Sequence, residues 1–242
     1  MDADYPKGMT QEIEQFFLSE ESRPAGLDSY DDVFSSHYFF PLQRRRELEK
    51  MMQIARSIAP KTVMEIGCDK SGGLYHWCKC LPSVQHVIAC EIRGTPYANA
   101  FEKAFPKIEF LWLPQSSMGD AIGSVDNWLA MRGSRVRIDC LFIDGDKSAF
   151  LKDFNAYLPM MNPQGIVFMH DVQDRPPMAA FETVKRRGLH DCSVILDVSE
   201  SEEAVERERS GIPSTCEHEN WLRIWKGRSC GVGVIKLEGN QA

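Results

Sequence analysis

IDCLFIDGDKSAFLKDFNAYLPMMNPQGIVFMHDV, the stretch from residue 138 to residue 172, decides the fold of this chain. It holds two apolar runs, 138–143 and 166–169, and charged residues follow each run at once. A helix-length segment separates the runs, so the pattern predicts two buried parallel strands joined by a crossover helix. Ligands bind at the carboxyl ends of the strands in such sheets. The polar clusters after the two runs therefore predict an active site.

The alternation of apolar runs with helix-length segments extends over most of the chain. Strands are expected at residues 62–66, 86–91, 108–113, 138–143, 165–169, 192–198 and 231–237. Helices are expected at residues 72–80, 95–105, 118–131, 147–159 and 176–187, after a first helix from Pro41 to Ile58. This order predicts an α/β domain over residues 42–242, with a doubly wound, seven-stranded and mostly parallel sheet. The Gly-rich last strand is expected to be antiparallel and near the edge.

Two segments depart from this alternation. Residues 1–41 are an N-terminal extension with helical character over Thr10–Leu18 and many aromatic residues from Tyr30 onward. These aromatic residues suit a lid over a pocket, packing against the sheet, or a homodimer interface. Residues 199–230 form a long, charged insertion before the last strand.

Composition excludes several classes of function. The chain has 242 residues and a formal net charge of −7, whereas nucleic-acid-binding proteins usually present a basic face. No apolar run approaches the roughly 20 residues that cross a bilayer, and the acidic start does not resemble a signal peptide. The eight cysteines are scattered and form no C-x-x-C pair. We therefore expect a protein of the reducing cytoplasm, with neither a nucleic-acid nor a membrane partner.

The first strand leads into a glycine-bearing turn and then a helix, in the order Glu65-Ile-Gly67-Cys-Asp-Lys-Ser71-Gly72-Gly73. Glycine lets a ligand approach the backbone, and the helix N-terminus offers N–H groups without partners. The signal is weak by itself, because the strict dinucleotide pattern G-x-G-x-x-G is absent.

The second strand ends in Glu91, where a carboxylate can accept hydrogen bonds from ribose hydroxyls. Taken alone, Glu91 fits a helix-capping role equally well. Together with the glycine turn, it favours a nucleotide-containing ligand.

At these residues the chain resembles the class I S-adenosylmethionine-dependent methyltransferases, with a Rossmann-like sheet. The matching features are the E-I-G turn with its S-G-G continuation, Glu91, and the F-I-D-G-D and N-P-x-G-x-V-F-x-H-D series, within residues 45–198. The last two series resemble the metal-dependent small-molecule O-methyltransferases of the macrolide-sugar and cephalosporin-tailoring types. The resemblance implies that the methyl donor contacts Glu65, Gly67, Ser71, Gly72, Gly73, Glu91, Ser117 and Asp144.

The same resemblance implies a divalent cation between the ends of the fourth and fifth strands. Its ligands would be Asp144, His170 and Asp171. Carboxylate oxygens favour magnesium, whereas an imidazole ligand leans toward manganese, iron, nickel or zinc. Two roles stay open for His170, a direct ligand or a hydrogen-bond partner of one.

Lys147 follows Asp144 at the spacing where the catechol-type relatives carry a proton-accepting lysine. A nearby cation would lower its pKa and make it a usable base. The expected chemistry is that the cation binds the acceptor hydroxyl, Lys147 or His170 takes the proton, and the oxygen attacks the donor methyl. Asp146 is either a further ligand or a residue that holds the loop, and Lys147 is otherwise a solvent-facing lysine.

One residue departs from the pattern of the relatives. Ser71 stands where they commonly have glycine, and a serine there is tolerable if its φ is negative.

Three functions remain in competition. The leading one is methyl transfer to the hydroxyl of a small-molecule acceptor. The second is a tailoring hydroxylase-like activity on the same fold with a redox metal, and the third is a non-catalytic donor-binding protein. The sequence does not identify the acceptor, because the resemblance places specificity in the segments 1–41 and 199–230.

Overall fold

The computed structural model describes residues 43, 45–69, 71–95, 97–133, 135–196 and 230–239. The expected helix at Thr10–Leu18, the N-terminal extension and the 199–230 insertion, apart from Cys230, lie outside these residues. No helix among the described residues is long and apolar enough to span a bilayer.

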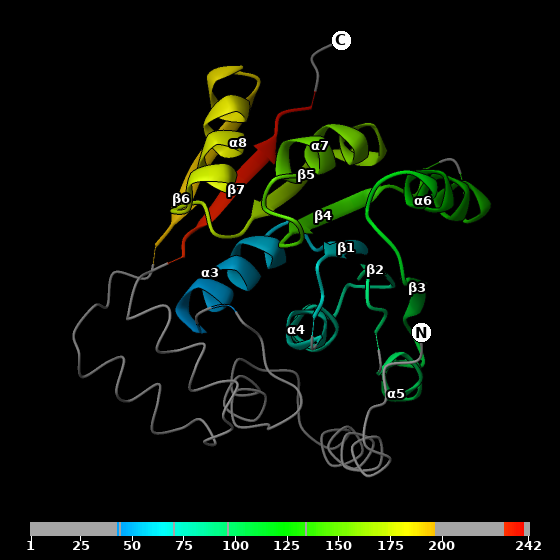
Figure 1. Cartoon of the computed structure of the whole chain (residues 1–242). Coiled ribbons are helices and arrows are strands. Elements are labelled where there is room, and N and C mark those ends of the chain that lie inside the picture. Colours follow the sequence, from blue (N-terminus) through cyan, green and yellow to red (C-terminus); the bar gives the residue numbers. More distant parts are fainter. Residues whose placement is uncertain are drawn as a thin grey trace.

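A seven-stranded sheet with the order β3-β2-β1-β4-β5-β7-β6 forms the centre of the described structure (Figure 1). Its strands are β1 Thr62–Ile66, β2 His86–Cys90, β3 Glu109–Leu113, β4 Ile138–Ile143, β5 Met161–Met169, β6 His190–Ile195 and β7 Val232–Leu237. The first five strands pair in parallel, and β7 runs antiparallel between β5 and β6. The predicted fold class is confirmed. The antiparallel last strand lies one place in from the edge.

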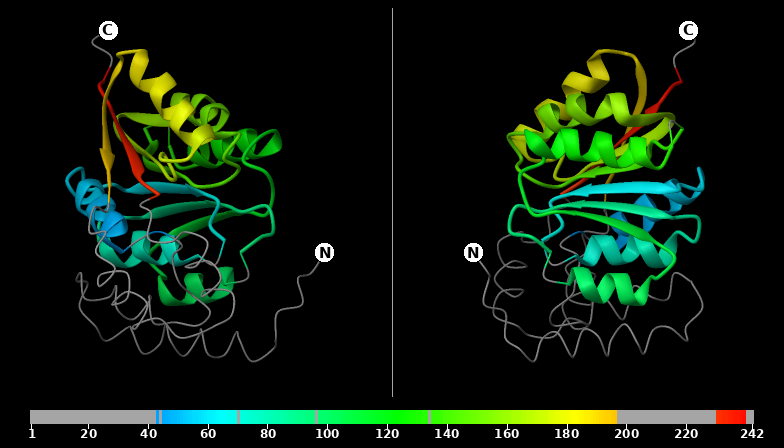
Figure 2. Two further views of the ribbon diagram at one scale, coloured as in Figure 1. Left: turned by 60° about the vertical axis from the view of Figure 1, so that its left-hand side comes forward. Right: turned by 90° about the vertical axis from the view of Figure 1, so that its right-hand side faces the viewer.

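Helices cover both faces of the sheet (Figure 2). They are α3 Arg45–Arg56, α4 Gly72–Cys80, α5 Ala98–Ala104, α6 Asp120–Met131, α7 Phe150–Tyr157 and α8 Arg175–Arg186. Side chains of α3, α4 and α5 pack on one face, and those of α6, α7 and α8 pack on the other. Because the central strands are buried on both sides, they read as unbroken apolar runs in the sequence.

Several element boundaries differ from the expected ones by a few residues, and two of these differences have a local reason. β5 begins at Met161, earlier than expected, because the pairing shifts register between Ile138–Met161 and Cys140–Ile166 and so accommodates the Asn162-Pro163 segment. α7 begins only at Phe150, because Asp146 folds the preceding residues into a turn.

Backbone hydrogen bonds extend the parallel ladder beyond the strand ends. The N–H of Gly67 donates to the Cys90 carbonyl at 2.8 Å, and the N–H of Asp144 donates to the Ile66 carbonyl at 2.8 Å. The N–H of His170 donates to the Ile143 carbonyl at 3.0 Å. The residues just after β1, β2, β4 and β5 are therefore held side by side at one edge of the sheet.

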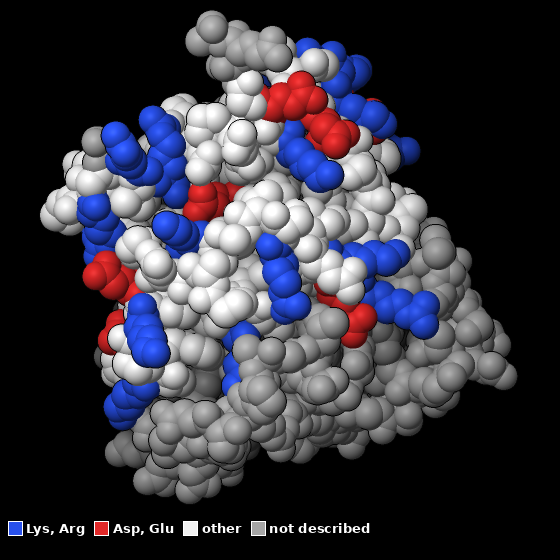
Figure 3. Space-filling view, turned by 180° about the vertical axis from the view of Figure 1, so that it is seen from behind, with Lys and Arg blue, Asp and Glu red and all other residues white. Residues whose placement is uncertain are grey.

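Surface charges of both signs are interspersed on the face shown in Figure 3. Lys and Arg side chains lie singly or in small groups among acidic and uncharged residues. The described part of this face has no continuous basic stripe.

Gly233 on β7 tests how tightly the sheet packs against α8. A Cβ added there would lie 2.6 Å from the ring of Phe181, so we expect Gly233→Ala to lower the free energy of unfolding by about 1–3 kcal/mol. Gly123 on α6 has nothing within 4 Å of its virtual Cβ, so Gly123→Ala should raise stability by about 0.5–1 kcal/mol. Urea denaturation measures both changes. Equal effects would contradict the packing at Gly233.

Candidate active site

A cavity of about 460 Å³ opens at the carboxyl ends of the parallel strands. This volume is within the usual range for small-molecule sites. Its lining includes nearly every residue predicted for the site, namely Glu65, Gly67, Gly72, Gly73, Glu91, Ser117, Asp144, Lys147, His170 and Asp171. The sequence therefore predicted residues that the fold brings into one cavity.

Two glycines of the first turn are required by close contacts. Gly67 has a φ of +84°, and a Cβ there would lie 2.5 Å from the carbonyl oxygen of Asp144. A Cβ at Gly73 would lie 2.5 Å from Oε1 of Glu65. The turn therefore packs directly against the end of β4 and against the Glu65 carboxyl group.

The Glu65 side chain packs against this turn. Its side chain is buried, and the indole N–H of Trp77 donates to its Oε2 at 2.8 Å. Burial raises the pKa of Glu65 well above its usual value, and the nearby Asp144 adds to this effect. The carboxyl group therefore joins α4 to β1 while it lines the floor of the cavity.

Ser71 does not meet the condition under which a serine is easily tolerated at this position. Its φ is +65°, in the left-handed region that favours glycine. Asp69 also has a positive φ of 37°, and a non-glycine residue in this region costs about 1–3 kcal/mol. The Ser71 side chain is fully buried, and its hydroxyl has no hydrogen-bond partner among the described residues. The turn is thus held in its shape by the packing around it.

Glu91 faces the cavity and does not cap a helix, because the next helix, α5, has Tyr97 as its N-cap. Its Oε2 accepts a hydrogen bond from the Asp69 N–H at 3.0 Å, and its Oε1 accepts one from the Arg93 N–H at 3.2 Å. The Arg93 guanidinium group pairs with Asp69 and lies 3.5 Å from Glu91. The sequence argument missed Arg93, which joins the first two loops of the site.

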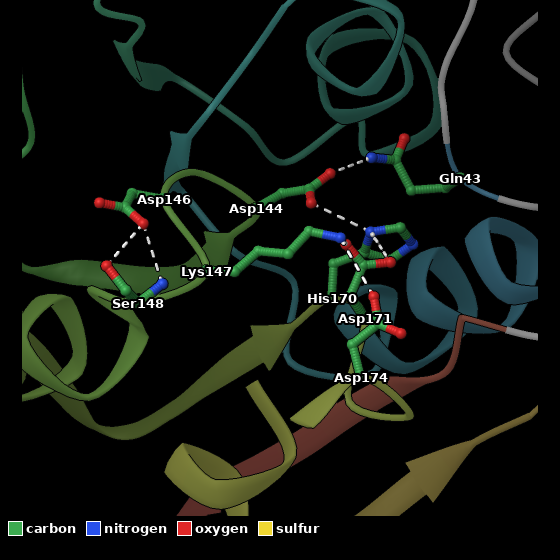
Figure 4. Close-up of polar contacts among 8 residues, drawn as sticks. All are labelled: Gln43, Asp144, Asp146, Lys147, Ser148, His170, Asp171 and Asp174. Atoms are coloured by element: carbon green, nitrogen blue, oxygen red, sulfur yellow. Dashed lines mark hydrogen bonds and ion pairs between the residues drawn. The ribbon is translucent and has the colours of Figure 1, made fainter. Parts of the chain in front are cut away.

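The ends of β4 and β5 carry a chain of polar contacts (Figure 4). The Nδ1 atom of His170 lies 3.0 Å from Oδ1 of Asp144 and 3.4 Å from Oδ1 of Asp171. The Nζ atom of Lys147 lies 2.5 Å from Oδ2 of Asp171 and 3.2 Å from Oδ2 of Asp174. All three predicted metal ligands are therefore neighbours, and Lys147 adjoins them.

These contacts shift the pKa values of the groups involved. Burial lowers the pKa of His170, but Asp144 and Asp171 outweigh it and hold the pKa well above its usual value. Burial raises the pKa of Asp171, but His170 and Lys147 reverse this and hold it well below its usual range. Burial also lowers the pKa of Lys147, yet its two carboxylate partners raise it overall. The lowered lysine pKa expected from the sequence therefore depends on a bound cation.

Asp146 makes the loop-holding contacts that one of its two predicted roles requires. Its Oδ1 accepts hydrogen bonds from the Ser148 N–H at 2.9 Å and from the Ser148 hydroxyl at 2.8 Å. Figure 4 shows its carboxylate away from the His170 cluster. Asp146 therefore shapes the turn before α7.

The hydroxyl of Ser117 already makes a hydrogen bond within the protein. It donates to Oδ1 of the buried Asp153 at 2.6 Å, and the Tyr157 hydroxyl donates to the Ser117 carbonyl. These contacts fix the loop after β3 against α7. Gln115 and Ser116 line the cavity beside Ser117.

Gln43 was missed by the sequence argument. Its buried side-chain amide donates to Oδ2 of Asp144 at 2.6 Å, although the two residues are 101 positions apart. Its Oε1 atom is buried without a hydrogen-bond partner among the described residues. No local pattern marks a glutamine just before a helix as part of a site.

Cys230 was also missed, because the sequence treats it as one of several scattered cysteines. Among the described residues, one group of three potential metal ligands has its ligand atoms within 4.8 Å of one another, and it is His170, Asp171 and Cys230. Asp144 is not a member of that group. Only the pairing of β5 with β7 in the structure shows that Cys230 lies beside His170 and Asp171.

The raised pKa of His170 predicts a pH dependence in metal-free protein. A histidine whose pKa is raised by folding contributes stability that is fully present below about pH 6.5 and is lost as the pH rises through the folded-state pKa. Wild type should therefore exceed His170→Gln in free energy of unfolding by more at about pH 6 than at about pH 9. Urea denaturation in EDTA measures the difference.

His190 provides the matched control, because partial burial lowers its pKa. In His190→Gln the sign should reverse, with wild type losing relative stability as the pH falls through about 6.5. The same pH trend in both variants would contradict the charge assignment of His170.

Comparison with known proteins indicates what kind of domain this chain contains. Residues 64–172 match a family model described as a methyltransferase domain. Comparison with curated protein sequences finds no match.

Solved structures of similar fold include three methyltransferases. The O-methyltransferase from Bacillus cereus in complex with SAH is 12% identical, with a TM-score of 0.53, and the match covers 97% of this chain and 93% of that one. The O-methyltransferase TomG from Streptomyces achromogenes, involved in tomaymycin synthesis and solved with SAM, is 13% identical, with a TM-score of 0.57 and coverage of 97% and 92%. The SAH-bound methyltransferase PaMTH1 from Podospora anserina is 13% identical, with a TM-score of 0.52 and coverage of 98% and 98%.

Such low identities show a common fold, and the family model adds the nature of the domain. The matched segment runs from β1 to just past the end of β5 and includes the glycine turn, Glu91, Asp144 and His170-Asp171. Residues 64–172 of this chain therefore resemble a methyltransferase domain in sequence, on a fold shared with solved methyltransferases.

Proposed function

We propose that the protein transfers a methyl group from S-adenosylmethionine to a hydroxyl of a small-molecule acceptor, with assistance from a divalent cation. One observation carries the proposal. A single cavity joins the glycine turn and Glu91 to the Asp144, Lys147 and His170-Asp171 cluster. A donor bound at the first group would present its methyl to an acceptor at the second.

The donor half of the proposal relies on the first two loops. The Glu91 carboxylate is the natural acceptor for the ribose hydroxyls. The turn at Gly67 leaves room for the donor because it carries no side chain. Gln115, Ser116 and Ser117 would border the adenine. The SAM and SAH in the similar solved structures support the same donor here.

The acceptor half relies on the carboxylates after β4 and β5. Asp144, His170 and Asp171 would hold the cation, which supplies an electrophile that lowers the pKa of the acceptor hydroxyl. Their oxygen and nitrogen atoms fit magnesium, manganese or iron. Both Asp144 oxygens already contact an N–H donor or an imidazole, from Gln43 and His170. Cation binding therefore requires these contacts to rearrange.

Lys147 and His170 are the proposed proton acceptors. Lys147 is 39% exposed at its side chain and reaches the cavity, so an acceptor hydroxyl can approach Nζ. Its pKa is raised while Asp171 and Asp174 hold the ammonium form. A cation bound to Asp171 would weaken this stabilisation of the ammonium form. The pKa of Lys147 would then fall, and its amine would become a better base.

A tailoring hydroxylase-like activity is the alternative that His170 favours, because imidazole suits a redox metal such as iron. It would require dioxygen and would leave the methyl donor unused. Mass analysis of the product distinguishes a gain of oxygen from a gain of a methyl group.

Glu91→Ala tests the donor half. Loss of charge-assisted hydrogen bonds should weaken S-adenosylhomocysteine binding about 100-fold in calorimetry. Glu182→Ala on α8, whose side chain is 46% exposed and outside the cavity lining, is the control and should bind like wild type. If wild type does not bind at all, the methyltransferase proposal fails.

Lys147→Met tests the proton acceptor. The rate of methyl transfer, followed with a phenol or sugar that wild type methylates, should fall about 10²–10⁴-fold. The affinity for S-adenosylhomocysteine should stay unchanged, because Lys147 lies in the acceptor half. Lys152→Met, on the outer face of α7, should retain the wild-type rate. An active Lys147→Met variant would leave His170 as the proton acceptor.

A further inference from the structure

We propose that His170, Asp171 and Cys230 bind a thiophilic transition-metal ion, zinc(II) or iron(II), at the junction of β5 and β7. The inference rests on the proposed function and revises its ligand set, because Cys230 takes the place of Asp144 and thereby determines the metal class. It relies on the proposed function only in sharing His170 and Asp171. Metal binding itself can be measured without any methyl transfer.

The topology of the sheet brings Cys230 to this place. β7 runs antiparallel to β5, with Gly233 opposite Met169, so the start of β7 meets the end of β5. The Val172 N–H donates to the Gly231 carbonyl at 3.2 Å, and the Gln173 N–H donates to the Cys230 carbonyl at 3.0 Å. These bonds fix the cysteine beside the two residues that follow β5.

The backbone around the three residues is tightly held. The Gly231 N–H donates to Oε1 of the buried Glu47 on α3 at 3.0 Å. Gly231 has a φ of +72°, and Asp171 has a φ of +56°, which is rare for a residue with a side chain. A positive φ at a non-glycine residue such as Asp171 persists only where the surroundings impose it, and such residues cluster at binding sites. The ligand atoms are therefore presented by fixed backbone.

The spacing and burial of the three side chains suit a metal ion. Their ligand atoms lie within 4.8 Å of one another, and the residues are only 3–4% exposed. Around tetrahedral zinc, neighbouring ligand atoms are about 3.5 Å apart. Side-chain rotations that move the ligand atoms by about 1 Å would bring them to the spacing found around zinc. Three protein ligands would leave a fourth position for a water molecule or an acceptor oxygen.

The imidazole of His170 has a nitrogen to offer. Nδ1 contacts Asp144 at 3.0 Å, whereas Nε2 is buried and has no hydrogen-bond partner among the described residues. A metal-bound histidine commonly directs its other nitrogen to a carboxylate, which orients the ring. Asp144 would then orient His170 instead of binding the ion. Lys147 pairs with Oδ2 of Asp171, which leaves Oδ1, 3.4 Å from Nδ1 of His170, as the carboxylate oxygen for the ion.

The donor types decide the metal. Magnesium prefers oxygen ligands, and a site with one carboxylate, one imidazole and one thiolate does not suit it. Thiolate and imidazole together favour zinc or iron(II). The metal would thus differ from the magnesium that the sequence resemblance favours.

Cobalt(II) titration of the chelator-treated full-length protein tests this assignment. Cobalt(II) replaces zinc and shows a thiolate-to-metal charge-transfer band in the near ultraviolet when a cysteine binds it. We expect this band to saturate at about one equivalent and to disappear on adding zinc(II). The band should be lost in Cys230→Ser, and cobalt affinity should fall in Asp171→Asn. Cys192→Ser, which changes a partly buried cysteine on β6, should keep the wild-type spectrum.

Cobalt binding by wild type without the charge-transfer band would overturn the proposal, since the ion would then be held by oxygen and nitrogen alone. Absence of cobalt binding would overturn it as well. The wild-type result does not depend on whether a variant folds, and thermal unfolding checks the variants. If S-adenosylhomocysteine binds while the band is absent, the metal inference fails and the proposed function stands. If the band appears but S-adenosylhomocysteine does not bind, the metal inference stands and the proposed function fails.

Discussion

Close packing of Gly67 against the carbonyl group of Asp144 determines the geometry of the whole site. A side chain at residue 67 would lie 2.5 Å from that oxygen and would separate the ends of β1 and β4. Because the two ends touch, the loops after both strands border one cavity. The Glu91 carboxylate and the His170 cluster thereby come to share a single space, which a bound molecule can bridge.

Charge is arranged in this space as a chain of alternating partners. Asp144, His170, Asp171 and Lys147 contact one another in sequence, and each raises or lowers the pKa of the next. In a buried setting such pairs interact strongly, because little water screens them. Any ion or hydroxyl that binds Asp171 therefore changes the pKa values of His170 and Lys147. The reactivity of the lysine and the histidine belongs to the whole chain of contacts.

The sequence was sufficient to predict the fold and to place most of the candidate residues at one edge of the sheet. Strands that are buried on both faces leave unbroken apolar runs, and the residues after those runs, such as Glu91 and Asp144, fall at the active edge by topology alone. The positive φ of Ser71 was not predictable, because packing around the turn imposes it. Gln43 and Cys230 escaped notice because contacts between distant segments bring them to the site. Gln43 contacts Asp144, which is 101 positions away, and the pairing of β7 with β5 places Cys230.

The late position of β7 in the chain affects how the protein folds during its synthesis. During synthesis the strands that carry the glycine turn, Glu91 and Asp144 leave the ribosome well before residues 230–237. Until β7 inserts between β5 and β6, the outer edge of β5 lacks its partner and Cys230 is absent from the corner beside His170. A nascent chain could therefore complete its donor pocket while the metal corner is still open. Insertion of the last strand is the folding step that finishes the site.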